Sequence, residues 1–147
     1  MGSCTASAVV NFAVELEAAC AALYEAMART YEKEQSIFRE LAKENEKNER
    51  LVRRTYYEVV SDALETGFSF EGLDLLNYTL DCRLENKAQS EAVTMALRSE
   101  ERIEQFYLAA AEQSKSLLAD VSRVFEKLIR QRKARKATLR KLLQVLH

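Results

Sequence analysis

The chain has 147 residues, of which 31% are charged and 48% hydrophobic, with three glycines and no proline. This length fits one domain over residues 1–147, and the scarcity of helix-breaking residues predicts an all-α fold. No uninterrupted apolar run approaches the roughly 20 residues that cross a membrane, so we expect no membrane partner. The N-terminus lacks the basic region of a signal peptide, so we expect a cytoplasmic protein.

The net charge of −1 hides an asymmetry along the chain. Residues 1–82 carry 15 acids against 8 bases, whereas residues 83–147 carry 8 acids against 14 bases. Halves of opposite sign attract, which favours their docking and also a head-to-tail homodimer. Cys4, Cys20 and Cys82 are far apart and form no Cys-x-x-Cys pair, so we expect reduced thiols.

Apolar residues recur at spacings of three and four in four segments, which predicts four amphipathic helices in chain order. The first inward stripe is Val10, Ala13, Glu17, Cys20, Tyr24, Met27 and Tyr31. The second is Phe38, Leu41, Asn45, Asn48, Val52, Thr55 and Val59. The third is Val93, Ala96, Glu100, Ile103, Tyr107, Ala110 and Ser114. The fourth is Phe125, Leu128, Arg132, Arg135, Leu139, Leu142 and Leu146.

The stripes repeat, because the first matches the third and the second matches the fourth. The chain therefore reads as two helical hairpins, over about 7–64 and 83–146, joined by a crossover over about 65–82. A short turn would place the third helix antiparallel beside the second, whereas a connection this long can cross the length of the bundle. We therefore predict an up-down-down-up four-helix bundle. We expect residues 73–80 to be partly helical, and Ser36 and Asp120 to cap the second and fourth helices.

The first and third helices share a Glu-x6-Tyr pattern. It reads Glu17 and Tyr24 in "ELEAACAALYEAMA", and Glu100 and Tyr107 in "SEERIEQFYLAAAE". With the hairpin repeat, this pattern resembles the ferritin-like superfamily, its rubrerythrin-like di-iron members especially. The resemblance covers nearly the whole chain. It implies that the two glutamates stand at iron-ligand positions, with the tyrosines close by.

The second and fourth helices depart from that family. The resemblance implies a Glu-x-x-His motif in each, but "FRELAKENEKNERLV" has Asn45 and Asn48 there, and "FEKLIRQRKARKATL" has Arg132 and Arg135. The chain's one histidine is His147. Asparagine is a poor ligand for iron, and arginine stays protonated. We therefore expect a degenerate di-iron site that holds no metal and no other cofactor.

Each of the four charged residues interrupts an apolar stripe at its middle, which predicts burial. Two carboxylates and two guanidiniums sum to zero, and buried charges need partners. We expect Arg132 and Arg135 to pair with Glu17 and Glu100, with the two asparagines and two tyrosines as further partners. Such a cluster can serve structure alone by fixing the register of the helices. A small anion near Arg132 and Arg135 is an alternative.

No nucleophile–base pair, phosphate loop or redox motif appears, so the sequence favours a structural or interaction protein over an enzyme. A divergent, iron-dependent oxidoreductase of the rubrerythrin type, with a carboxylate-only site, remains the alternative.

The basic segment 130–141 is expected to be a solvated helix face and not a nucleic-acid site. Its outward bases would be Arg130, Lys133, Lys136, Arg140 and Lys141. A surface cation site at Glu44, Glu46 and Glu49 is a weaker alternative.

Overall fold

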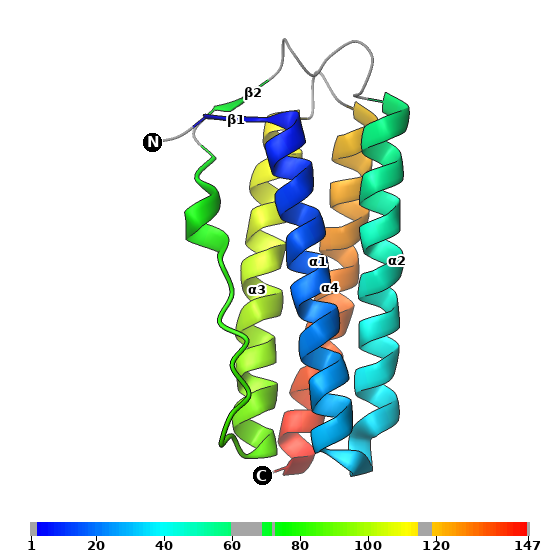
Figure 1. Cartoon of the computed structure of the whole chain (residues 1–147), viewed down its shortest axis with the longest axis vertical. Helices are drawn as coiled ribbons and strands as arrows, with labels where there is room; N and C mark the ends of the chain where they lie inside the picture. The colour runs from blue at the N-terminus through cyan, green and yellow to red at the C-terminus, as the bar shows by residue number, and fades with distance from the viewer. Residues whose placement is uncertain (1–2, 60–68, 72, 115–118, 147) are drawn as a thin grey trace.

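The computed structural model describes residues 3–59, 69–71, 73–114 and 119–146, and four long α-helices dominate this part of the chain (Figure 1). They are α1 (Ala6–Thr30), α2 (Gln35–Val59), α3 (Gln89–Ser114) and α4 (Ala119–Leu146). The predicted four-helix, predominantly α-helical architecture is confirmed. The three glycines, Gly2, Gly67 and Gly72, all lie outside the described residues.

The helices form two packed pairs that share one core. α1 packs against α2 and α3, and α4 packs against α3 and α2. Within each pair, α1 with α2 and α3 with α4, the two helices run in opposite directions (Figure 1). Residues 73–88 run beside α3 and include a short 3₁₀ helix, η2 (Leu75–Tyr78), where the sequence predicted partial helix.

The predicted helix caps at Ser36 and Asp120 are wrong, because both residues lie inside their helices. Between the first two helices the chain turns through a short 3₁₀ segment, η1 (Glu32–Glu34), which continues directly into α2. The backbone N–H of Gln35 donates to the carbonyl of Glu32, so this turn supplies a backbone partner where a side-chain cap was expected. A side-chain cap does occur at α1, where Thr5 accepts from the N–H of Ala8 at 3.0 Å.

The third helix begins later than residue 83, at Gln89. Asn86 has a φ of 57°, in the left-handed region that ends regular helix, and asparagine tolerates this conformation better than most residues. The Glu91 carboxylate then accepts a hydrogen bond from the N–H of Ala88 at 3.0 Å. This turn followed by a cap sets the start of α3.

A small β-ladder was not predicted. β1 (Ser3–Thr5) pairs antiparallel with β2 (Ser69–Glu71), with Cys4 opposite Phe70. Phe70 is buried and belongs to the main core, so the ladder is anchored to the bundle.

The α1 helix is long and apolar enough to cross a membrane by length and composition alone, although no uninterrupted apolar run spans it. More than half of its most apolar window is buried inside the bundle, which is where a core helix places such residues. The side chain of Glu17 lies at the centre of this buried face. The apolar character of α1 is therefore accounted for by packing within the fold.

The predicted inward stripes are buried over most of their length. Tyr31 and Leu146, at the ends of two stripes, are only partly buried, and the side chains of Val59 and Ser114 lie outside the described part. Aromatic rings pack against each other within this core, with the centroids of Phe12 and Phe106 5.2 Å apart. The middle of every stripe is polar or charged, so the apolar core surrounds a polar centre.

Candidate functional site

Eight side chains that the sequence singled out are buried, and hydrogen bonds and ion pairs join them into one cluster. Each is at most 4% exposed. They are Glu17 and Tyr24 from α1, Asn45 and Asn48 from α2, Glu100 and Tyr107 from α3, and Arg132 and Arg135 from α4. All four helices thus contribute to a continuous polar network, which we call the central cluster.

Arg132 lies between the two carboxylates. Its Nη2 donates to Glu17 Oε1 at 2.9 Å, and its Nε lies 3.0 Å from Glu100 Oε1. All three side chains are fully buried, so water screens these ion pairs very little. The Nε–Oε1 contact is close, but its geometry is not that of a hydrogen bond, and neither atom has another partner. We therefore treat it as an ionic contact only.

Arg135 has every N–H donor used. Its Nε and Nη2 both donate to Glu100 Oε2, at 3.1 and 2.9 Å, and Nη2 also donates to Asn45 Oδ1 at 2.8 Å. Its Nη1 donates to the carbonyl of Leu41 at 3.1 Å and to Glu44 Oε1 at 2.7 Å. A guanidinium offers five such donors, so this side chain is held in one orientation.

Each of the two tyrosines donates a hydrogen bond to a glutamate of the other hairpin. Tyr24 in the first hairpin donates to Glu100 Oε2 in the second at 2.5 Å, and Tyr107 donates to Glu17 Oε2 at 2.6 Å. Each ring also has a guanidinium over its face. Arg135 Cζ lies 5.3 Å from the centroid of Tyr24, and Arg132 Cζ lies 5.8 Å from that of Tyr107. The reciprocal bonds tie the two halves of the repeat together.

The asparagines add hydrogen-bond donors and acceptors to the cluster without changing its net charge. Glu17 Oε1 accepts from Asn45 Nδ2 at 2.7 Å and from Asn48 Nδ2 at 3.3 Å. Asn48 also exchanges two hydrogen bonds with Gln131, at 2.6 and 3.3 Å. Glu17 thereby receives four hydrogen bonds, including those from Arg132 and Tyr107. This solvation by the protein replaces the water that burial removes.

The electrostatics fix the protonation states in the cluster. Burial alone would raise the pKa of Glu100, but Arg132 and Arg135 outweigh it and hold the pKa below its ordinary value. Burial and Glu100 raise the pKa of Tyr24 well above its ordinary value, and burial and Glu17 do the same for Tyr107. The cluster therefore contains an ionised Glu100 and neutral phenols.

The residues present do not fit a di-iron centre. Only two of the six ligand positions that the resemblance implies are carboxylates, and each of these carboxylates is already bonded to a guanidinium. A divalent cation placed between them would lie beside two positive charges in a buried site. Within the described residues, no group of three or more His, Cys, Asp or Glu side chains is arranged to hold a metal ion.

Two members of the network were missed from the sequence. Gln131 is adjacent to Arg132 and so lies off the predicted stripe, yet its Oε1 accepts from Asn48 and from Arg132 Nη1 at 3.2 Å. Glu44 was expected only in a surface acidic cluster with Glu46 and Glu49, but its carboxylate pairs with Arg135. A signal for Glu44 existed, because Leu41, Glu44 and Asn48 follow helical spacing.

The expected outward position of Lys136 is wrong. This residue is 8% exposed, and its Nζ contacts Glu104 at 2.5 Å and Glu101 at 2.8 Å. It lies four residues after Arg132 and three before Leu139, which places it on the inward face of α4. Within the acidic cluster, Glu49 pairs with Arg53 at 3.4 Å.

Cys20 is a buried free thiol beside the cluster, whereas Cys82 is partly buried and also free. Burial and Glu100 raise the pKa of the Cys20 thiol well above its ordinary value, which keeps it protonated and unreactive.

No family model, no curated protein and no solved structure matches this chain.

Proposed function

We propose that this chain is a ferritin-like, rubrerythrin-related bundle in which the central cluster takes the place of a di-iron centre. The proposal includes the up-down-down-up helix order with one long crossover. Its support is the antiparallel run of each helix pair and the course of residues 73–88 beside α3 (Figure 1). The role that follows is that of a structural or interaction protein.

One observation carries the proposal. Arg132 and Arg135 occupy the positions that the resemblance assigns to the Glu-x-x-His motif of the fourth helix. Arg132 contacts both remaining carboxylates, Glu17 and Glu100, and Arg135 contacts Glu100. Four carboxylates facing two divalent cations are neutral as a set, and so are two carboxylates facing two guanidiniums. An internal salt bridge thereby satisfies the same electrostatic requirement without a metal.

A catalytic role is disfavoured by the state of these groups. A general base needs a pKa near the working pH, and the arginines lower that of Glu100. A thiol nucleophile needs a lowered pKa, and burial raises that of Cys20. The donors of Arg135 are also already bonded, so a small anion between the arginines would first have to displace a carboxylate.

Metal analysis tests the proposal. Protein purified from medium supplemented with iron, manganese and zinc should contain far less than one ion per chain. A restored variant, Asn45→Glu, Asn48→His, Arg132→Glu, Arg135→His, rebuilds both motifs and should bind Co²⁺ with a visible absorption band that the natural chain lacks. Stoichiometric metal in the natural chain would overturn the proposal.

A further inference from the structure

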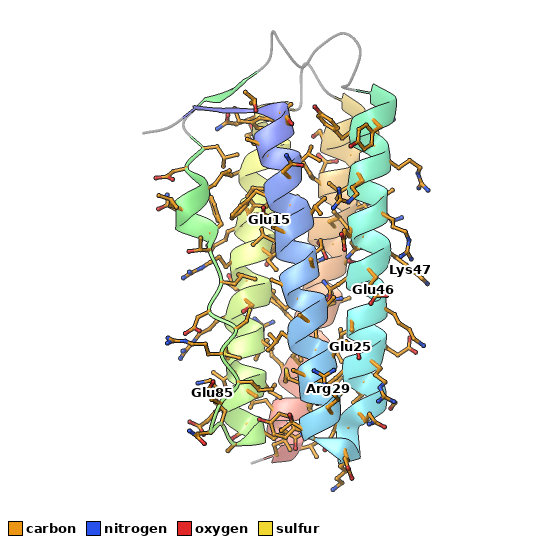
Figure 2. All side chains as sticks on the ribbon, in the orientation of Figure 1. Glu15, Glu25, Arg29, Glu46, Lys47 and Glu85 are labelled. Carbon is orange, nitrogen blue, oxygen red and sulfur yellow. The ribbon has the colours of Figure 1, made fainter. Side chains whose placement is uncertain are left out.

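A groove of about 730 Å³ lies between α2 and α4, beside the central cluster. Its α2 wall includes Lys43, Lys47, Arg50 and Arg54, and Lys127 lies on its α4 wall. These five cations make no salt bridge with any residue in the described part of the chain. Figure 2 shows Lys47 extending from α2 away from the bundle.

The cations on α2 form a line. Lys43, Lys47, Arg50 and Arg54 follow one another at intervals of four, three and four residues, which keeps them on one helix face over about 16 Å. Two carboxylates also line the groove, and one of them, Glu44, already pairs with Arg135. The groove is therefore clearly positive, and an anionic partner would be attracted to it.

The groove also has apolar surface. Ile37 and Leu51 are only partly buried and line it together with Leu41. None of the described residues that line it is aromatic, so it lacks the stacking platform that single-stranded nucleic acids use. Glu40 on its wall would also repel phosphates. A ligand that combines apolar and acidic side chains along one line fits better than a nucleic acid.

The central cluster fixes the two walls relative to each other. Asn48 on α2 and Gln131 on α4 exchange hydrogen bonds where both residues line the groove. Arg135 on α4 bonds to Glu44 and to the carbonyl of Leu41 on α2. A groove whose walls are already held in place loses less conformational freedom when a ligand binds.

We propose that the α2–α4 groove binds an acidic amphipathic helix of a partner protein. The partner's apolar side chains contact Ile37, Leu41 and Leu51, and its carboxylates pair with the line of α2 cations and with Lys127. A second copy bound face to face through the same groove would bring like charges together, so this face does not form a symmetric dimer. The inference rests on the interaction role proposed above and names its partner.

A fluorescence-anisotropy titration with a designed peptide tests the inference. The probe is a labelled helical peptide of about 18 residues with Leu on one face and Glu on the other, long enough to follow the groove. A scrambled peptide of the same composition and a single-stranded oligonucleotide serve as comparison ligands. The natural chain should bind the probe more tightly than either, and less tightly as salt rises.

Charge reversal locates the binding surface. Lys47→Glu with Arg50→Glu should weaken binding by about tenfold or more, because four units of charge change beside the ligand. The matched control, Arg98→Glu with Lys141→Glu, makes the same change at exposed positions outside the groove and should leave affinity within about twofold. Both variants should keep the helical circular dichroism of the natural chain.

The inference would be overturned by equal binding of the scrambled peptide, by equal affinity of the two charge-reversal variants, or by tighter binding of the oligonucleotide. Self-association that only the Lys47→Glu, Arg50→Glu variant abolishes would assign the groove to a second copy and overturn it too. Metal content should be measured on the same preparations. Peptide binding at the outer groove does not depend on metal content, so the two measurements distinguish failure of the groove proposal from failure of the proposed function.

Discussion

Replacing Arg132 by methionine probes the central cluster most directly. Methionine keeps much of the side-chain volume, so the change removes charge and hydrogen bonds without opening a large cavity. In the variant, Glu17 loses its guanidinium partner, whereas Glu100 keeps Arg135. The cluster then carries one uncompensated negative charge in a fully buried place.

The structure sets the size of the effect. Arg132 lies 2.9 Å from Glu17 and 3.0 Å from Glu100, and all three side chains are 0% exposed. Removing one partner of such a buried pair costs about 3–5 kcal/mol of the free energy of unfolding. Folded domains are stable by only about 5–15 kcal/mol, so this one change should lower the melting temperature by roughly 10 °C or more.

Urea unfolding followed by circular dichroism measures the effect, with Arg130→Met as the control. Arg130 is exposed on the same helix, and its replacement should change stability by less than about 0.5 kcal/mol. The double variant Arg132→Met, Glu17→Gln restores neutrality and should recover much of the loss. Strictly additive losses, or a cost for Arg132→Met no larger than that of Arg130→Met, would refute the pairing as the source of stability.

Two further predictions concern the tyrosines and pH. Tyr24→Phe and Tyr107→Phe should each cost about 1.5–3 kcal/mol in urea unfolding, because each removes a buried hydrogen bond to a carboxylate; a negligible cost for both would contradict the exchanged bonds. The arginines lower the pKa of Glu100 below its ordinary value of 4.5, so stability should fall as pH drops below about 4.5. Burial raises the pKa of Tyr24 and Tyr107 above 10, so stability should also fall as pH rises above about 10, where only the unfolded phenols ionise. Thermal melts from pH 3 to 11 should therefore show a melting temperature that is highest between these two limits. A melting temperature that does not fall at either end would contradict both expectations.

Periodicity predicted much of the cluster because each cluster residue replaces an apolar one in a helical stripe. A residue such as Arg132, between Leu128 and Leu139 on the same face, has no outward orientation available unless the helix breaks. The repeat then placed equivalent positions at the same depth. Burial and ion pairing of these residues therefore follow from the sequence pattern.

Other features depend on contacts that no local pattern records. The pairing of β1 with β2 joins residues far apart in the sequence, and neither strand alone has enough residues to show alternation. Gln131 enters the network through a long side chain that reaches from beside the stripe to Asn48. Lys136 is buried despite its charge because it lies between Arg132 and Leu139 on the inward face of α4.

Electroneutrality limits which residues can occupy the α2 and α4 positions of the cluster. Equivalent positions carry asparagines in α2 and arginines in α4, while both copies keep glutamate and tyrosine. Arginines in both copies would give four buried positive charges against two carboxylates, and asparagines in both would leave two carboxylates without a cation. Either symmetric set would bury a net charge of two, at several kcal/mol for each uncompensated ion. A centre built around Glu17 and Glu100 is neutral when two of these four α2 and α4 positions carry arginine, and this chain has both arginines in α4.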